Sequence, residues 1–139
     1  MSDDTLRDLL GTHGNGGLVA LKRDGRPQIS TVSYAYDRDR DLIRVSVTAD
    51  RAKTANLRRD PRASLYVTGN RGWAYAVAEA RAELMPTAAS TDDASVEELV
   101  DIYRAIGGEH PDWDEYRRAM VQDGRVPLLL HVERVYGLA

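Results

Sequence analysis

The chain has 139 residues, of which 19 are basic and 22 are acidic, and it contains no cysteine. This length corresponds to one domain over residues 1–139, and a content of 42% hydrophobic and 29% charged residues excludes a disordered or fibrous chain. The lack of cysteine excludes disulfides and thiol nucleophiles, and the net charge of −3 argues against a general nucleic-acid binder, which carries a clear positive excess.

Several further classes of protein are disfavoured by what the sequence lacks. No stretch reaches the roughly 20 apolar residues that span a bilayer, and the acidic start of the chain lacks the order of a secretory signal. We therefore expect a cytoplasmic protein that does not insert into a membrane. The three histidines lie far apart without ligand spacing, which predicts no metal site. No nucleophile elbow or phosphate-binding loop is present, so no catalytic residue is identified.

Helices are predicted near the start, in the middle and late in the chain. The clearest covers 92–106, where Val96, Leu99 and Tyr103 share one face and Gly107 follows the last turn. The predicted helices are residues 4–12, 51–59, 92–106 and 111–124.

Most of the remaining chain is predicted to form strands, separated by turn sequences such as Asp24-Gly25. Residues 73–84 have the composition of a helix but the alternating pattern of a strand, and we assign them to a strand. The predicted strands are residues 18–22, 28–36, 42–48, 62–68, 73–84 and 125–136. Six strands with one short helix after the third and two late helices predict a mainly β (α+β) fold, a small barrel with helices at its ends.

The segment of residues 50–62 carries the strongest functional signal. Asp50 follows a predicted strand and is a favourable N-cap for a helix that begins at Arg51. A first helical turn normally favours acidic residues, because the helix dipole is positive there, yet this turn holds Arg51 and Lys53. A bound phosphate would reverse that cost, with free N–H groups and the Thr54 hydroxyl converging on it and Asn56 adding an amide. The alternative is that these are ordinary surface cations in an arginine-rich protein.

Charge is distributed unevenly along the chain. Residues 51–62 hold five basic residues and one acidic residue, a net charge of +4. Residues 92–115 hold nine acidic residues and one basic residue, a net charge of −8. A local basic patch on a mildly acidic protein favours anionic small molecules over long nucleic acids.

Several motifs, taken in order and spacing, resemble one family. They are Leu18-Val-Ala-Leu, Asp24-Gly-Arg-Pro-Gln-Ile-Ser, Ile43-Arg-Val-Ser-Val, the basic segment of residues 51–62, Gly72-Trp-Ala-Tyr-Ala-Val-Ala-Glu, Gly107-Gly-Glu-His-Pro-Asp-Trp and His131-Val-Glu-Arg-Val-Tyr-Gly. The chain resembles the pyridoxamine 5'-phosphate oxidase-like, FMN-binding split β-barrel superfamily, and within it the actinobacterial oxidoreductases that depend on the deazaflavin coenzyme F420. The resemblance covers nearly the whole chain. It implies a six-stranded antiparallel split β-barrel and a homodimer with two cofactor sites at the interface.

The resemblance also implies which residues contact the cofactor. Its phosphate would be held by the residues of the anion site described above, Arg51, Lys53, Thr54 and Asn56. Its flat ring would be lined by Gln28, Ile29, Ser30, Ser46 and Val47. The partner subunit would contribute Trp73 and Tyr75, for which ordinary packing is an equally good interpretation.

Two cofactors of this superfamily remain to be separated. FMN ends at its phosphate, whereas F420 continues into an anionic glutamate tail that Arg58, Arg59 and Arg62 would suit, unless they face water. The expected function is hydride transfer from reduced F420 to an unsaturated small molecule. The alternatives are an FMN-binding oxidase or reductase, and a non-catalytic F420 carrier. A nucleic-acid-binding barrel lacks the expected stacking aromatics beside the basic segment.

Overall fold

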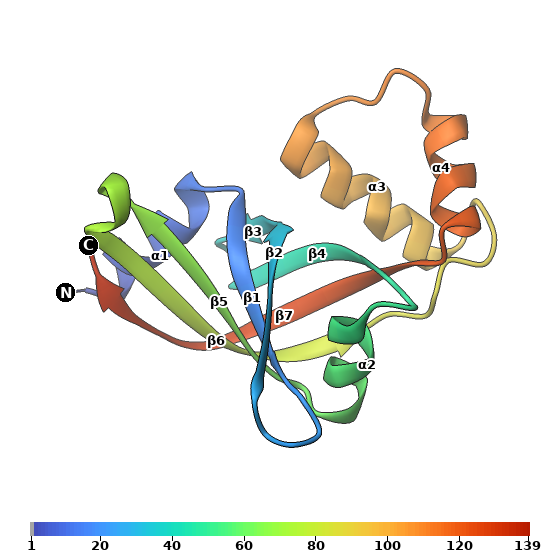
Figure 1. Ribbon diagram of the computed structural model, residues 1–139. Helices are drawn as coiled ribbons and strands as arrows, with labels where there is room; N and C mark the ends of the chain where they lie inside the picture. The colour runs from blue at the N-terminus through green and yellow to red at the C-terminus, as the bar shows by residue number, and fades with distance from the viewer. Residues whose placement is uncertain (1) are drawn as a thin grey trace.

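The computed structural model describes residues 2–139, which form one antiparallel sheet of seven strands and four α-helices (Figure 1). The strands are β1 (Asn15–Leu21), β2 (Pro27–Ser33), β3 (Ala35–Asp37), β4 (Leu42–Thr48), β5 (Arg62–Gly69), β6 (Ala74–Leu84) and β7 (Arg125–Leu138). The helices are α1 (Asp3–Thr12), α2 (Ala52–Arg59), α3 (Ala94–Gly107) and α4 (Trp113–Gln122), and a 3-10 turn, η1, covers Asn70–Gly72. The predicted mainly β, α+β class is confirmed.

The sheet contains seven strands instead of the predicted six, because the predicted strand over 28–36 breaks at Tyr34. The Tyr34 side chain is buried and its hydroxyl donates to the Leu10 carbonyl, while its backbone N–H donates to Gly14 at 2.9 Å. These bonds turn the chain between β2, which pairs with β1, and β3, which pairs with β4. The alternating β-branched pattern of residues 28–36 contains no signal of this long-range contact.

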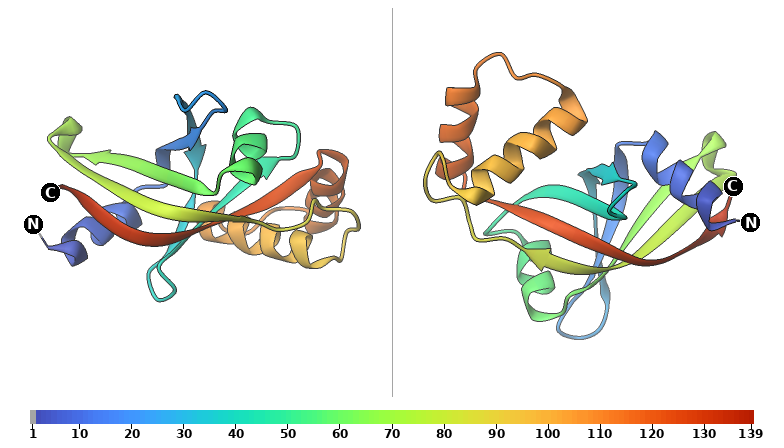
Figure 2. Two further views of the ribbon diagram at one scale, coloured as in Figure 1. Left: turned by 90° about the horizontal axis from the view of Figure 1, so that it is seen from below. Right: turned by 180° about the vertical axis from the view of Figure 1, so that it is seen from behind.

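The strand order β2-β1-β5-β6-β7-β4-β3 places two strands that are consecutive in sequence at opposite edges. The sheet must therefore curl so that these edges approach each other, which produces a half-barrel (Figures 1 and 2). Leu18, Ile43, Leu65 and Leu128 are fully buried on its inner face. Helix α1 packs against β3, β5, β6 and β7, and it adds two buried leucines, Leu6 and Leu10, to the same core.

Helices α3 and α4, which lie between β6 and β7 in the sequence, form a second, smaller core. Val96, Leu99 and Tyr116 are buried in it, and the Tyr116 hydroxyl donates to the Leu99 carbonyl at 2.9 Å. Arg44 of β4 pairs with Glu98 of α3 at 3.2 Å and attaches the helical pair to the sheet. Among the described residues, no helix is both long and apolar enough to cross a bilayer.

A close backbone contact at the end of the sheet generates a stability prediction. Gly137 has φ +154°, and a Cβ placed there would overlap the backbone of Tyr75 on the paired strand. We expect Gly137→Ala to lower the free energy of unfolding in urea by about 1–3 kcal/mol, the cost of a strained backbone position. Gly14→Ala is the matched control because a Cβ there meets no atom within 4 Å, and it should change the free energy by less than about 1 kcal/mol. Equal effects of both substitutions would contradict the prediction.

Candidate cofactor and substrate cavity

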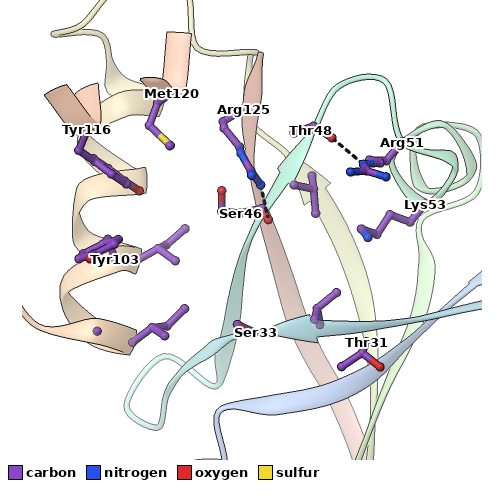
Figure 3. Close-up of a pocket in the computed structure, with 15 residues that line it drawn as sticks. Thr31, Ser33, Ser46, Thr48, Arg51, Lys53, Tyr103, Tyr116, Met120 and Arg125 are labelled. Atoms are coloured by element: carbon purple, nitrogen blue, oxygen red, sulfur yellow. Dashed lines mark hydrogen bonds between the residues drawn. The ribbon is translucent and has the colours of Figure 1, made fainter. Parts of the chain in front are cut away.

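The main cavity has a volume of about 610 Å³ and lies where the end of β4, helix α2 and the α3–α4 pair meet (Figure 3). Its walls differ in character. Arg51, Lys53 and Arg125 provide positive charge on the side of the sheet and α2. The α3–α4 side is mostly apolar. The arrangement therefore suits a ligand that carries both an anionic group and an apolar body.

The start of α2 has no side-chain cap. The predicted cap by Asp50 is wrong: the helix begins at Ala52, the cap residue is Arg51, and Asp50 is exposed. The Arg51 side chain makes no capping bond and instead donates from Nε to Thr48 Oγ1 at 3.3 Å. The first turn also contains no acidic residue. Its N–H groups and its positive dipole end are thus left to an external anion.

Lys53 lies in a positive local potential. Burial lowers the pKa of its ammonium, and the charges of Arg51 and Arg125 lower it further. A lowered pKa means that the folded protein resists the charged form of Lys53. A bound anion would oppose this effect, because it favours the ammonium. The electrostatics and the uncapped helix end therefore point to the same kind of ligand.

The other two predicted phosphate residues point elsewhere. Thr54 is fully buried, and its hydroxyl donates to the Thr48 carbonyl at 2.7 Å, so it ties α2 to the end of β4. Asn56 lines a separate groove between α2 and the β1–β2 hairpin, where its Oδ1 accepts from Arg59 at 3.0 Å. Among the four phosphate residues inferred from the sequence, Arg51 and Lys53 are the two that reach the cavity.

Only some of the residues predicted to line the ring lie at the cavity. Ser46 and Val47 line the cavity, whereas Gln28 faces the groove beside Asn56. Ile29 projects outward with 66% of its surface exposed. Ser30 Oγ and Gln28 Oε1 are buried and have no hydrogen-bond partner within the described chain. The cavity instead uses the next residues of β2, Thr31 to Ser33.

Trp73 and Tyr75 lie far from the cavity of their own chain. Trp73 precedes β6 instead of belonging to it, and 78% of its surface is exposed. The turn between β5 and β6 lies beside the chain termini, at the opposite end of the sheet from α2 (Figures 1 and 2). Any contact of these two residues with a ligand in the cavity would have to come from a second subunit.

Two parts of the cavity could not be predicted from the sequence. Arg125 begins β7 and is paired with Thr48 across the sheet, so only the strand register brings it beside Arg51 and Lys53. The apolar side contains Ile102, Tyr103 and Met120. The helical period of these residues can be recognised in the sequence. The sequence does not indicate which element their helix face packs against.

The sequence model of the family described as pyridoxamine 5'-phosphate oxidase matches residues 2–139. The chain belongs to this family.

Solved structures with the family's fold are named for different cofactors. An F420 reductase is 18% identical with a TM-score of 0.70, and the match covers 94% of both chains. A FAD-binding protein from Mesorhizobium loti is 20% identical with a TM-score of 0.70, over 99% of this chain and 92% of that one. A heme binding protein from Mycobacterium smegmatis is 18% identical with a TM-score of 0.70, over 96% of this chain and 52% of that one. These likenesses establish the fold and leave the cofactor open.

The arginines suggested for a cofactor tail do not share one surface in this family member. Arg58 is exposed on α2, and Arg59 lines the groove with Asn56. Arg62 pairs with Asp60 at 2.7 Å and lines another hollow beside β1 and β6. The three side chains therefore do not form a single tail site.

The potential around Lys53 generates a prediction with a defined pH dependence. Sulfate keeps its charge above neutral pH, and at about ten times its dissociation constant it should raise the melting temperature at pH 7 by about 4 °C. The increment should fall as the pH rises through the lowered pKa of Lys53, because the neutral amine no longer attracts the anion. Scanning calorimetry over this pH range measures the effect.

The chain contains one other lysine, Lys22, which provides the control. Lys22 lies outside the cavity. Lys53→Ala should remove most of the sulfate increment, whereas Lys22→Ala should retain it. Loss of the increment in both variants would show that the sulfate effect does not come from the α2 site.

Proposed function

We propose that the protein binds coenzyme F420 through its phosphate at the start of α2 and acts as an oxidoreductase on an unsaturated small molecule. The observation that carries the proposal is the uncapped N-terminus of α2, with Arg51 and Lys53 facing a cavity large enough for a ring system. Backbone N–H groups, a guanidinium and an ammonium are the groups that bind a phosphate.

The choice of F420 over FMN has two supports. The motifs of the chain resemble the F420-dependent branch of the superfamily, and the fold matches a solved F420 reductase over 94% of both chains. A flavin is the alternative, favoured by the family and by the FAD-binding neighbour. The three arginines considered for the cofactor tail, Arg58, Arg59 and Arg62, do not favour either cofactor, because they face different surfaces.

The protein's own residues would bind and orient the reactants. The cofactor supplies hydride transfer when it is bound. Arg51 and Lys53 fix its phosphate, and the backbone of Ser46 and Val47 borders the space in which a ring would lie. Tyr116 does not suit a proton donor, since burial raises the pKa of its hydroxyl to about 12 and that hydroxyl already donates to Leu99.

A homodimer is part of the proposal, and the outer face of the sheet supports it. Tyr66, Tyr136 and Leu138 are each about half exposed, at 45%, 49% and 55%. They lie on β5 and β7, on either side of β6, with Tyr66 opposite Val77 of β6 and Val77 opposite Tyr136. An exposed apolar band of this kind is typical of a protein interface. A second copy on this face would cover the band and bring its own Trp73 region close to the interface.

The cofactor assignment predicts a specific loss of affinity. Lys53→Ala should weaken F420 binding by about 1.5–3 kcal/mol, the range for a hydrogen bond to a charged group. Fluorescence titration of F420 measures the constant, and Lys22→Ala should bind like the native protein. Tight binding of FMN by a protein that does not bind F420 would reject the choice of cofactor.

A turnover assay separates an enzyme from a carrier. Reduced F420 should be oxidised in the presence of at least some members of a panel of enones and quinones, at a rate that depends on the protein. Binding of F420 without turnover of any panel member would instead support a non-catalytic carrier.

The proposed interface predicts a change in mass. Tyr66→Asp places a charge in the apolar band and should convert a dimer into a folded monomer in sedimentation equilibrium. Arg26→Asp, on the exposed β1–β2 turn, should leave the mass unchanged. A native protein that sediments as a monomer would overturn the dimer.

A further inference from the structure

Arg125 occupies the middle of the cavity, between its cationic end and its apolar wall. Its charge adds to the lowering of the Lys53 pKa on one side, and on the other it opposes the rise that burial causes in the pKa of Tyr116. Figure 3 shows the side chain between Tyr116 and Met120 on one side and Thr48, Arg51 and Lys53 on the other. Arg125 therefore lies between the proposed phosphate ligands and the apolar wall of the cavity.

The guanidinium of Arg125 has unused hydrogen-bonding capacity. Its Nε is buried without a partner among the described residues, and its contact with the Ser46 carbonyl is long, at 3.5 Å. No carboxylate of the described chain lies within ion-pair distance of it. A buried N–H group without a partner is costly, so an oxygen from a ligand would stabilise this arrangement.

The backbone of Arg125 is held firmly. The residue pairs with Thr48 in the sheet, and its carbonyl accepts from Ala88 at 2.8 Å. The side chain thus projects from a fixed strand position instead of a loop. A fixed cation of this kind suits the orientation of a ligand.

The wall that faces Arg125 is apolar and well packed. Ile102 and Met120 are almost fully buried, and Tyr103 packs edge-on against Tyr116 with ring centroids 5.0 Å apart. Ile106 is 44% exposed and extends this wall toward the cavity mouth. An apolar ring or chain that packs here is removed from water, which is the main source of its binding energy.

We infer that α3 and α4 form a substrate subsite for an apolar, conjugated molecule that carries one carboxylate, and that Arg125 binds this carboxylate. The inference rests on the proposed function in one respect, because it treats the α2 end of the cavity as the place of the cofactor phosphate. Arg125 is then a specificity-determining residue, which separates acids from neutral analogues of the same shape.

The test uses naphthylacrylate, an aromatic conjugated carboxylate, together with its primary amide, and measures both by calorimetry on the full protein. The acid should bind at least tenfold more tightly than the amide, as expected for a charge-assisted hydrogen bond. Arg125→Met should remove this preference. Ile106→Asn should weaken the acid and the amide by a similar factor, since both use the apolar wall.

Arg118→Met is the matched control, because Arg118 is exposed on α4 and does not line the cavity. It should keep the preference for the acid. Absence of any preference in the native protein, or its loss in Arg118→Met, would overturn the inference.

Titration of F420 on the same variants separates this inference from the proposed function. Arg125→Met should alter F420 affinity by less than threefold, and a tenfold loss would assign Arg125 to the cofactor phosphate and overturn the substrate subsite. Failure of the native protein to bind F420 would reject the proposed cofactor, while the preference for the acid, measured without cofactor, would still support the carboxylate subsite.

Discussion

The cavity depends on the pairing of the end of β4 with the start of β7. Thr48 is opposite Arg125, and just beyond this pair the Ala49 N–H donates to the Gly124 carbonyl at 2.9 Å. The chain enters α2 directly after β4 and leaves α4 directly before β7. One strand register therefore brings two helices from distant parts of the sequence to the same place. The Thr54 hydroxyl, bound to the Thr48 carbonyl, then fixes the orientation of α2 against this end of the sheet.

The charged residues around the cavity are divided between the end of the sheet and the α3–α4 pair. The cations of the cavity come from α2 and the start of β7, while much of the acidic segment on α3 and α4 lies on their outer surfaces. Several of these acids are paired: Glu97 with Arg117 at 2.6 Å, and Glu109 with Arg104 at 3.1 Å. The helical pair thus carries most of its acidic residues on exposed surfaces and its apolar residues inside, while Glu98 faces the sheet and pairs with Arg44.

The sequence was informative where structure is set by neighbouring residues. The helical period of residues 92–106 and the alternation of 42–48 predicted their elements, and the misfit of Arg51 and Lys53 at a helix start identified the residues that reach the cavity. The break at Tyr34 depends on partners in and after α1, which no local pattern encodes. Thr54 lies about 100° around the helix from Lys53 and so faces the core. Asn56 lies three residues after Lys53, which places it about 4.5 Å from Lys53 along the helix axis. The place of Arg125 in the cavity could be predicted only from the strand register.

The helical pair is inserted between two strands that are direct neighbours. Leu84, at the end of β6, is opposite Leu128 near the start of β7, and Ala88 still donates to the Arg125 carbonyl of β7. The chain therefore leaves the sheet after Ala88, forms α3 and α4, and returns to the adjacent position at Arg125. Their second core is separate from that of the half-barrel. The helices can thus change in length or sequence without shifting any strand register, while the α2 end of the cavity stays as it is. The fold is therefore modular: one part can diversify what the cavity accepts, and the other keeps the charged anchor in place.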